Sequence, residues 1–500
     1  MKTRSSIPIV EHLHVRLEPE DLDRIDRLAQ ALLADEPALA SGAAFGSDVT
    51  AGLDDGPALL FEDHAEITLF ERRGDASLQY RALLLAGEGD FVLIGGERSP
   101  VFEAYCRDTL GLGAAQVIGV AGAARGARTG SLAQRCAQDA QAFATIVDAA
   151  RRHGRLTLVP YIGAGQAWTL AAKVAAQSGA RVSVAAPPPR LTRRVNDKLW
   201  FAGCVQQLLG GTALPPSYHA FEPAALTGRV AALARRHARV VIKVPDSAGS
   251  AGNLVLDAER VRGLRLGGLR RRLLRLLGNL GWDAGFPLMV GVWDCAVLGS
   301  PSVQLWIPRR EAGLPQVEGV FDQVVEGSGG EFVGAVPSSV PAAWRQRLAD
   351  EALQLGVLFQ RLGYFGRCSF DAVIAGEAFE GAALHWIECN GRWGGTSIPM
   401  TLANRLLGDW GRRAFMIMQR TSLSNPPRDL SQALRGLRGL LYRRGSTDTG
   451  VVLLTPGGLE QGTGLHFLLL ARNIDELNEQ AAALQRLLGD ERATPSAPRG

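Results

Sequence analysis

Lysine, paired cysteines and long hydrophobic runs are scarce or missing in this chain. Only four of the 54 basic side chains are lysines, so nearly every cation is an arginine. The six cysteines form no C-x-x-C pair and no zinc-like spacing, which favours a reducing compartment such as the cytoplasm. No uncharged run reaches the ~18 residues that a membrane-spanning helix needs, and the first residues do not form a secretory signal. We therefore expect a cytoplasmic protein without a membrane partner.

Several familiar kinds of functional motif are also missing. The segment GVAGAARGARTGS, residues 119–131, follows an apolar run but lacks the G-K-[ST] ending of a P-loop. The segment YIGAGQAW has two glycines of a dinucleotide fingerprint, but Trp168 is too bulky for the third position, so a bare turn explains it better. The eight histidines are dispersed and form no Ser/His/Asp or Cys/His constellation. We expect no covalent protein nucleophile.

The charge balance does not indicate a nucleic-acid partner. Hydrophobic residues make up 46% of the chain and the formal net charge is only +4, as in folded multi-domain proteins. The most basic stretch, residues 260–278, has leucines at helical spacing and no aromatic residues that could stack on bases. We interpret it as an amphipathic helix that covers a lobe.

Hydrophobic periodicity divides the chain into consecutive parts. Short apolar runs alternate with helical patterns before the prolines at 187–189, which predicts a parallel, doubly wound, Rossmann-like unit. A longer α/β region follows the prolines. The predicted fold class is α/β and α+β, multi-domain: an N-terminal extension (1–75), an α/β domain (76–190), a longer domain (191–427), a small α+β C-terminal domain (428–490) and a disordered tail (491–500). The family resemblance described below implies that the domain 191–427 has two lobes with a hinge near residues 290–294.

One of the rare lysines stands at the end of an apolar strand. Lys243 closes the run ARVVIK and precedes the loop PDSAGSAGN. Its ammonium is a compact point charge that fits a phosphate slot, and backbone N–H groups near Gly249 and Gly252 can fold over phosphate oxygens. An ordinary turn after a surface lysine is the alternative, which the dominance of arginine disfavours. Lys198 lies at the entry to a predicted helix, so two of the four lysines flank one predicted lobe.

Carboxylate and amide side chains interrupt two predicted strands, CSFDAVI and LHWIECNG. Period-2 alternation places Glu388 and Asn390 on one face and Ile387 and Cys389 on the other. If the strands pair as a hairpin, Asp371 shares the face of the two polar residues. Such oxygen ligands suit a hard cation such as Mg²⁺, which completes its shell with water and substrate phosphates. A solvent-facing polar strand is the alternative, but the apolar neighbours and the glycines that follow favour a ligand site.

The order of these residues resembles that of the ATP-grasp superfamily: Lys198, Lys243, the loop with Gly249 and Gly252, Asp371, Glu388, Asn390 and Arg392. The resemblance covers about residues 191–427, and the α/β unit before it resembles a pre-ATP-grasp domain. It implies that ATP lies between two lobes, with Lys198 and Lys243 at its adenine and phosphate region and the glycine loop over its phosphates. It also implies that the hinge MVGVWD offers backbone groups, including those of Val292, to the adenine, and that Asp294 binds the ribose.

The resemblance further implies a metal site and a phosphate contact. Asp371, Glu388 and Asn390 would hold Mg²⁺, or Mn²⁺, and Arg392 would face the transferred phosphate. The form IECNGRWGGTS and the flanking domains look most like the pheganomycin-type peptide ligases, which join an unusual N-terminal acid to the amino group of a peptide. Two positions depart from many relatives. Gly291 stands where a hinge Glu is common, and Ser369 stands where some relatives place an Arg, so we assign no role to the nearby Arg367.

We predict an ATP-dependent carboxylate–amine ligase that acts through an acyl phosphate. It would join an amino acid or modified acid to the amine of an amino acid or peptide in specialised peptide biosynthesis. The expected partners are these small molecules and no nucleic acid, and a homo-oligomer is compatible with the sequence. The alternative is a nucleotide-binding regulatory protein of ATP-grasp fold without ligase activity, which has little need for three metal ligands.

Overall fold

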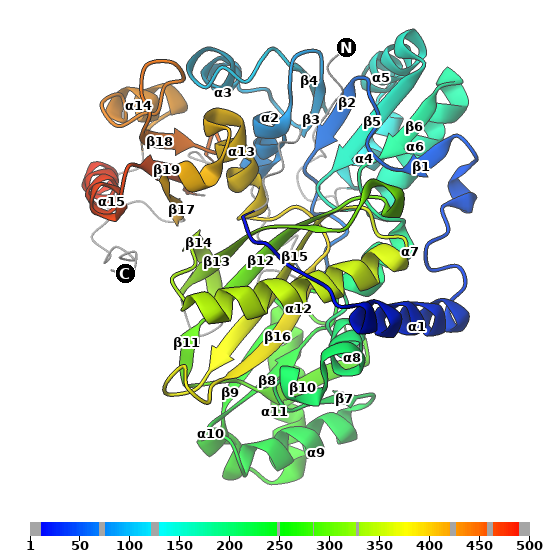
Figure 1. Ribbon diagram of the computed structural model, residues 1–500, viewed down its shortest axis with the longest axis vertical. Coiled ribbons are helices and arrows are strands. Elements are labelled where there is room, and N and C mark those ends of the chain that lie inside the picture. The colour runs from blue at the N-terminus through cyan, green and yellow to red at the C-terminus, as the bar shows by residue number, and fades with distance from the viewer. Residues whose placement is uncertain are drawn as a thin grey trace.

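The computed structural model describes residues 12–69, 76–121, 130–247, 251–283, 285–326, 330–420, 427–457 and 464–489. Gly249, most of the segment 119–131 and the tail 491–500 lie outside these residues. Strands of the described chain form three sheets, of six, four and nine strands. Figure 1 shows the six-stranded sheet at the top, the nine-stranded sheet across the middle and the four-stranded sheet at the bottom. None of the described helices is long and apolar enough to span a membrane.

The six-stranded sheet is parallel throughout, with the strand order β1-β6-β5-β2-β3-β4. Its strands are β1 (Val49–Ala51), β2 (Ala58–Phe61), β3 (Phe91–Gly95), β4 (Gln116–Val120), β5 (Arg155–Pro160) and β6 (Arg181–Val184). Helices α4 (Leu132–Gln138), α5 (Ala140–His153) and α6 (Gly165–Ser178) pack on one face, and α2 (Arg81–Leu85) and α3 (Pro100–Ala104) on the other. The expected boundary at residue 76 is therefore too late, because β1 and β2 are short strands that belong to this sheet.

Helices cover both faces of this sheet, and its strands are therefore apolar along most of their length. Leu59 packs with the α4–α6 layer, whereas the next residue, Leu60, packs with α2 and α3. Helices α5 and α6 end at Gly154 and Gly179, whose φ angles of 66° and 70° are left-handed and favour glycine. The doubly wound unit predicted from the alternation of apolar runs is confirmed.

The four-stranded sheet is antiparallel, with the strand order β7-β10-β8-β9. One face carries the helices, and α11 buries Leu269, Leu273 and Leu277, which confirms that the arginine-rich stretch is an amphipathic helix. The opposite face presents Lys243 beside Met289. The elements are β7 (Ser217–Ala220), α9 (Pro223–Ala234), β8 (Arg239–Lys243), β9 (Asn253–Asp257), α10 (Ala258–Arg262), α11 (Leu266–Leu280) and β10 (Leu288–Val292).

The nine-stranded sheet has the order β11-β15-β12-β13-β14-β17-β19-β18, and β16 pairs with β15. The long helix α12 (Ala342–Arg361) lies across one face, and α1 (Pro19–Asp35) packs on α12, so the N-terminal segment is a folded part of this lobe (Figure 1). The strands are β11 (Val297–Gly299), β12 (Pro301–Ile307), β13 (Gln316–Glu326), β14 (Glu331–Pro337), β15 (Gly366–Ala375), β16 (Ala383–Asn390), β17 (Ala414–Arg420), β18 (Gly450–Leu453) and β19 (Leu465–Ala471).

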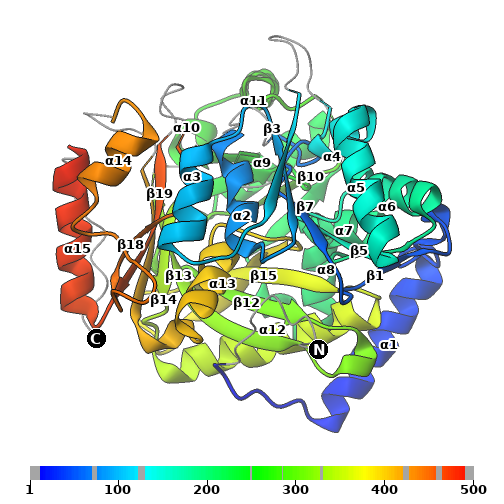
Figure 2. The same ribbon diagram turned by 90° about the horizontal axis from the view of Figure 1, so that it is seen from above.

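The C-terminal segment is α+β, as expected, but its strands extend the large sheet. β19 pairs with β17, and β17 pairs with β14 of the central lobe. Helices α14 (Leu430–Gly436) and α15 (Ile474–Leu488) flank this end, and Figure 2 shows α15 outermost, beyond β19. Asn473 is the N-cap of α15, because its side chain accepts a hydrogen bond from the Glu476 N–H.

The exit of β16 is held against the carboxyl-terminal edge of the parallel sheet. The Trp393 N–H donates to the carbonyl of Tyr161 over 2.9 Å, and Ile162 and Arg392 form an isolated β-bridge. Helix α7 (Pro189–Asn196) starts within the proline run, α8 (Lys198–Leu209) follows it, and α13 (Ser397–Leu407) follows β16. Segments far apart in sequence therefore meet where β16 ends.

Candidate active site

The hairpin of β15 and β16 carries the polar cluster expected from the sequence. Asp371 lies opposite Glu388, and Ser369 lies opposite Asn390. The register then shifts: Ala372 pairs with Trp386, so Ile387 is an extra residue. The bulge is essential, because strict alternation would place Glu388 on the face of the buried Trp386.

The bulge separates an apolar face from a polar face of β16. Trp386 and Cys389 are both buried in the core beneath α12, and the Trp386 Nε1–H donates to Glu351 of that helix over 2.7 Å. Glu388 and Asn390 are displayed on the opposite face. The expectation that these two side chains share a face with Asp371 is therefore met, through a bulge that the sequence pattern did not reveal.

Asp371 is surrounded by neutral donors and by a second carboxylate. The Ser302 hydroxyl donates to its Oδ1 over 2.6 Å, and the Asn390 amide donates to its Oδ2 over 2.9 Å. Burial raises the pKa of Asp371 to about 6, and the charge of Glu388 contributes to the increase. The charge of Arg392 opposes this increase only in part, so a bound cation would further stabilise the ionised carboxylate.

The donor set at this point fits a cation that keeps other ligands. Among the described residues, no group of three or more His, Cys, Asp or Glu side chains could hold a metal ion. Asp371, Glu388 and the free oxygen of the Asn390 amide supply oxygen ligands only. Mg²⁺ is commonly bound by one or two carboxylates together with water and substrate phosphates, so the residues fit such an ion.

Two buried lysines face the carboxylates. The Lys198 Nζ lies 3.0 Å from Glu388 Oε2 and also donates to the carbonyl of Ser247. The Lys243 side chain makes no hydrogen bond or ion pair with the residues that the structure describes, although only 7% of the residue's surface is exposed. The pKa of Lys243 is lowered to about 8, chiefly by burial; the charge of Glu388 opposes the shift and the charge of Lys198 adds to it. Burial pushes the pKa of Glu388 upward, but the two lysines outweigh it and the pKa is lowered.

The hinge after β10 brings a further carboxylate to this cluster. Asp294 Oδ2 lies 2.9 Å from His385 Nδ1, and its charge acts on Lys243. His385 lies on β16 and was missed by the sequence reasoning, because a lone histidine on a strand carries no signal of its partner. We expected the backbone groups of Val292 to face the adenine. The Val292 N–H already donates to the carbonyl of Pro216 over 2.9 Å, so this N–H is not free for that contact.

The glycines of the site permit close approaches. A Cβ on Gly391 would lie 2.4 Å from a methyl group of Val195 in α7, and the Gly391 N–H donates to Asn196 Oδ1 over 3.1 Å. A Cβ on Gly252 would lie within 2.5 Å of the Ser247 side chain. A side chain at Gly252, in the loop after β8, or at Gly391, in the turn after β16, would therefore collide with neighbouring groups.

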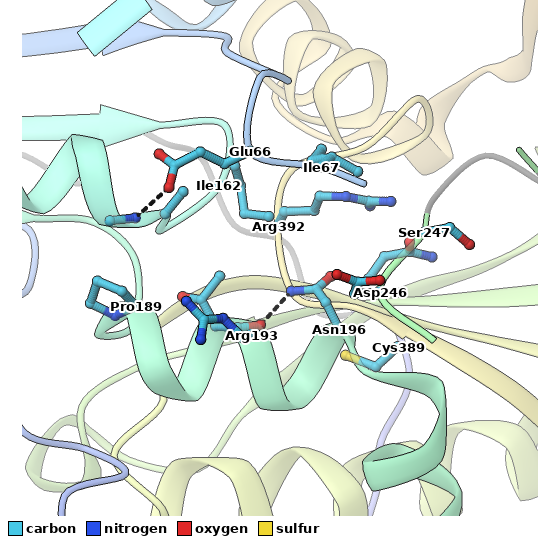
Figure 3. Close-up of a pocket in the computed structure, with 14 residues that line it drawn as sticks. Glu66, Ile67, Ile162, Pro189, Arg193, Asn196, Asp246, Ser247, Cys389 and Arg392 are labelled. Carbon is cyan, nitrogen blue, oxygen red and sulfur yellow. Dashed lines mark hydrogen bonds between the residues drawn. The ribbon is translucent and has the colours of Figure 1, made fainter. Parts of the chain in front are cut away.

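A pocket opens beside Arg392 (Figure 3). The Arg392 side chain makes no hydrogen bond or ion pair within the described chain, and its guanidinium carbon lies 6.0 Å from the centre of the Tyr161 ring. Asn390 and Arg392 form one side of the pocket, so it adjoins the carboxylate cluster. Other wall residues were not predicted, since they come from separate segments: Glu66, Arg193, Asn196 and Asp246.

The N-terminus of α6 is already occupied by a carboxylate of the chain. Glu66 accepts hydrogen bonds from the N–H groups of Gly165 and Gln166, over 3.1 and 3.0 Å. A dinucleotide phosphate would bind at this helix end in a Rossmann fold. Trp168 is buried behind it and donates to the carbonyl of Pro187. The geometry agrees with the rejection of a dinucleotide site here.

Arg367, to which no role was assigned, is buried away from the pocket. It forms an ion pair with Glu318, and its guanidinium lies 5.3 Å from the ring centre of Trp306 and 4.8 Å from that of Trp393. It also donates to Thr401 Oγ1 over 3.2 Å. Because Trp393 directly follows Arg392, the buried Arg367 anchors the turn that carries Arg392.

Comparisons with known proteins agree with this fold. Residues 79–176 match the family described as Pre ATP-grasp domain, and no curated protein matches the sequence. The ADP complex of N5-carboxyaminoimidazole ribonucleotide synthetase is 12% identical, with 89% of this chain and 98% of that chain covered at a TM-score of 0.50. The biotin carboxylase–beta-gamma-ATP complex from Campylobacter jejuni is 11% identical, with 87% and 91% covered and a TM-score of 0.51.

A third solved structure shares the fold. N5-carboxyaminoimidazole synthase from Aspergillus clavatus, in complex with ADP and 5-aminoimidazole ribonucleotide, is 13% identical, with 89% of this chain and 99% of that chain covered at a TM-score of 0.50. At such identities the likeness concerns the fold alone. The matched family model covers residues 79–176 only, and neither comparison singles out the pheganomycin-type ligases.

Proposed function

We propose that the protein is an ATP-dependent ligase that joins a carboxylate to an amine through an acyl phosphate. The observation that carries this proposal is the charge cluster at the end of β16, where Glu388 and Asp371 face Lys198 and Lys243 beside a pocket, and the Lys243 side chain has no bonded partner among the described residues. Buried charges that lack full compensation are costly to a fold and are typical of sites that bind charged ligands. The neighbours are described as ADP or ATP complexes, which supports a nucleotide as that ligand.

In this proposal the two lysines and the glycine loop hold the phosphates of ATP. Lys198 and Lys243 neutralise phosphate oxygens, the loop of Gly249 and Gly252 covers them, and Asp294 meets the ribose. Of Val292, the carbonyl rather than the engaged N–H would serve the adenine. Asp371, Glu388 and Asn390 would hold Mg²⁺ or Mn²⁺, which supplies positive charge to the phosphates when bound.

Arg392 acts at the reacting groups. A substrate carboxylate oxygen attacks the γ-phosphorus of ATP, the bond to the bridging oxygen breaks, and ADP leaves. The Arg392 guanidinium stabilises the charge spread over the transferred phosphoryl oxygens. The amine then attacks the acyl carbon, its proton is lost, and phosphate departs as the amide forms. Arg392 lines the pocket close to Asn390, so its guanidinium can stabilise negative charge in both the phosphoryl transfer and the attack of the amine.

The substrates in this proposal are small. An amino acid or a modified acid is activated, and the amine belongs to an amino acid or a peptide, as in the pheganomycin-type ligases of specialised peptide biosynthesis. The enzyme would act in the cytoplasm, and a homo-oligomer is compatible with the proposal.

An assay of ADP formation tests the ligase. The full-length protein, ATP and Mg²⁺ are incubated with a panel of carboxylic acids against amino acids and short peptides, and new amides are identified by mass spectrometry. We expect ADP formation that requires both an acid and an amine. ADP release that ignores both, or ATP binding without turnover, would contradict the ligase and favour a regulatory nucleotide-binding protein.

A further inference from the structure

We propose that the pocket beside Arg392 binds a free α-amino acid as the amine substrate, with Arg193 holding its carboxylate and Glu66 and Asp246 facing its ammonium group. The inference rests on the proposed ligase, and it names the class of the amine substrate and the residues that select it.

The pocket is built from five separate segments of the described chain. They are the loop after β2, the loop after β5, one face of α7, the loop after β8 and the exit of β16. On α7, Pro189, Thr192, Arg193 and Asn196 lie at helical spacing and share the face that lines the pocket. Figure 3 shows Arg193 and Arg392 in different parts of the pocket wall. The pocket therefore presents two separate guanidinium groups.

Both guanidinium groups are available to a ligand. The side chains of Arg193 and Arg392 form no hydrogen bond or ion pair with the described residues. Arg392 lies beside Asn390, and in the proposed reaction its guanidinium binds the transferred phosphoryl group. Arg193 is then left for a second anionic group of a substrate, and a carboxylate matches the planar fork of a guanidinium.

Two carboxylates on the wall are bonded only to neutral donors. Glu66 accepts the N–H groups of α6, and Asp246 Oδ2 accepts the Thr68 hydroxyl over 2.7 Å. Neither forms an ion pair among the described residues. Burial raises the pKa of Glu66, while the charge of Arg193 opposes the increase, so the two groups act on each other across the pocket. Each carboxylate keeps acceptor capacity for an ammonium group.

An α-amino acid matches this arrangement of charge. Its ammonium and carboxylate are attached to one carbon atom, and the pocket offers acidic and basic groups around one cavity. A simple amine would leave Arg193 unpaired, and a simple carboxylate would leave the two acids uncompensated. A peptide would separate its ammonium from its terminal carboxylate and match the pair less well.

Binding of amino acids to the full-length protein tests the inference directly. Each common L-amino acid, its carboxamide and its N-acetyl derivative are titrated by calorimetry in the presence of Mg²⁺ and a non-hydrolysable ATP analogue. We expect at least one amino acid to bind, and its carboxamide to bind about tenfold or more weakly, as for the loss of a charge-assisted hydrogen bond. Equal binding of the N-acetyl derivative would overturn the ammonium contact and assign the carboxylate to the acid substrate instead.

A matched pair of variants assigns the carboxylate contact to one residue. Arg193→Gln should weaken amino-acid binding by about tenfold or more and remove the preference over the carboxamide, with Arg193→Lys restoring part of it. Arg194 on the same helix is ion-paired with Glu36 over 2.8 Å and does not line the pocket, so Arg194→Gln should bind like wild type. An unchanged preference in Arg193→Gln, or no binding of any amino acid, would overturn the inference.

The two proposals fail in different measurements. Amide formation with amines other than free amino acids, together with no amino-acid binding, would leave the ligase intact and refute this inference. Amino-acid binding that depends on Arg193 without any amide formed would support the pocket and contradict the ligase.

Discussion

Two buried charge clusters in this molecule differ in how completely their charges are paired. At the carboxyl edge of the parallel sheet, both oxygens of Glu62 accept hydrogen bonds from Arg81, one of them over 3.0 Å from Nε, and His64 Nε2 lies 2.8 Å from the carboxylate. Burial pushes the pKa of Glu62 upward, but Arg81 and His64 outweigh it and the pKa is lowered. Every charge of this cluster is compensated within the chain.

The cluster at the end of β16 is incomplete by comparison. One ion pair joins Lys198 to Glu388, Lys243 has no bonded partner among the described residues, and the pKa of Asp371 is raised to about 6 by burial and by Glu388. A paired cluster stabilises the structure around it. An unpaired one costs stability and provides groups for a charged ligand. The first is therefore interpreted as structural and the second as functional, although both are buried and ionic.

The largest expected effect is on the stability of the paired cluster. Glu62→Gln leaves the Arg81 guanidinium buried without a counter-charge, which should lower the free energy of unfolding by about 3–5 kcal/mol. Urea denaturation measures it. Asp148→Asn, which breaks an exposed pair with Arg151, is the control and should cost less than about 1 kcal/mol. A loss below 1 kcal/mol in Glu62→Gln would remove the distinction between the clusters.

The next largest effect is on turnover, through the incompletely paired cluster at the end of β16. Glu388→Gln removes a charge from the proposed metal site, so ADP formation should fall by at least about 100-fold while unfolding stays cooperative. Glu351→Gln, in helix α12 on the opposite side of β16, should change turnover only a few-fold, since the bonds of Glu351 to Trp386 and Arg347 lie outside the site. Near-wild-type activity in Glu388→Gln would refute the metal assignment.

A smaller effect on stability, an increase rather than a loss, is expected when Asp371 is replaced. Its raised pKa means that the ionised carboxylate destabilises the native state, so Asp371→Asn should stabilise the ligand-free protein by about 1 kcal/mol or more near pH 7. The advantage should be present above pH ~6 and vanish below pH ~4, where the carboxyl is protonated in the native and unfolded states. Thermal unfolding at a series of pH values measures it. A destabilised variant at pH 7 would show that Asp371 is already compensated.

The smallest effect concerns ATP affinity and pH. Because the pKa of Lys243 is lowered to about 8, its ammonium is lost from the free protein as the pH rises through that value. The Kd for ATP should therefore rise up to about tenfold between pH 7 and pH 9. Calorimetric titration measures it, and Lys243→Met should bind ATP more weakly with little dependence on pH. The same dependence in Lys243→Met would assign the titration to another group.

Local sequence features predicted the paired strands and the candidate lysines. An apolar strand that ends in lysine is recognisable in a chain dominated by arginine, and alternation along a strand is a local property. The bulge at Ile387 was not recognisable, because alternation is disrupted by a register shift that depends on the partner strand β15. Asp294 and His385 could not be paired in advance either, since their contact joins the hinge to β16.

The sequence by itself determined the types of element, the doubly wound unit and the residues able to carry charge at the end of β16, because periodicity and side-chain chemistry are local. Tertiary structure alone decided which charges are compensated. Glu62 and Arg81 come from different elements and bind each other, whereas the charge of Glu388 acts on Lys243, whose side chain has no bonded partner among the described residues. Burial and distance set the free energy of a charge, and both exist only once the chain has folded.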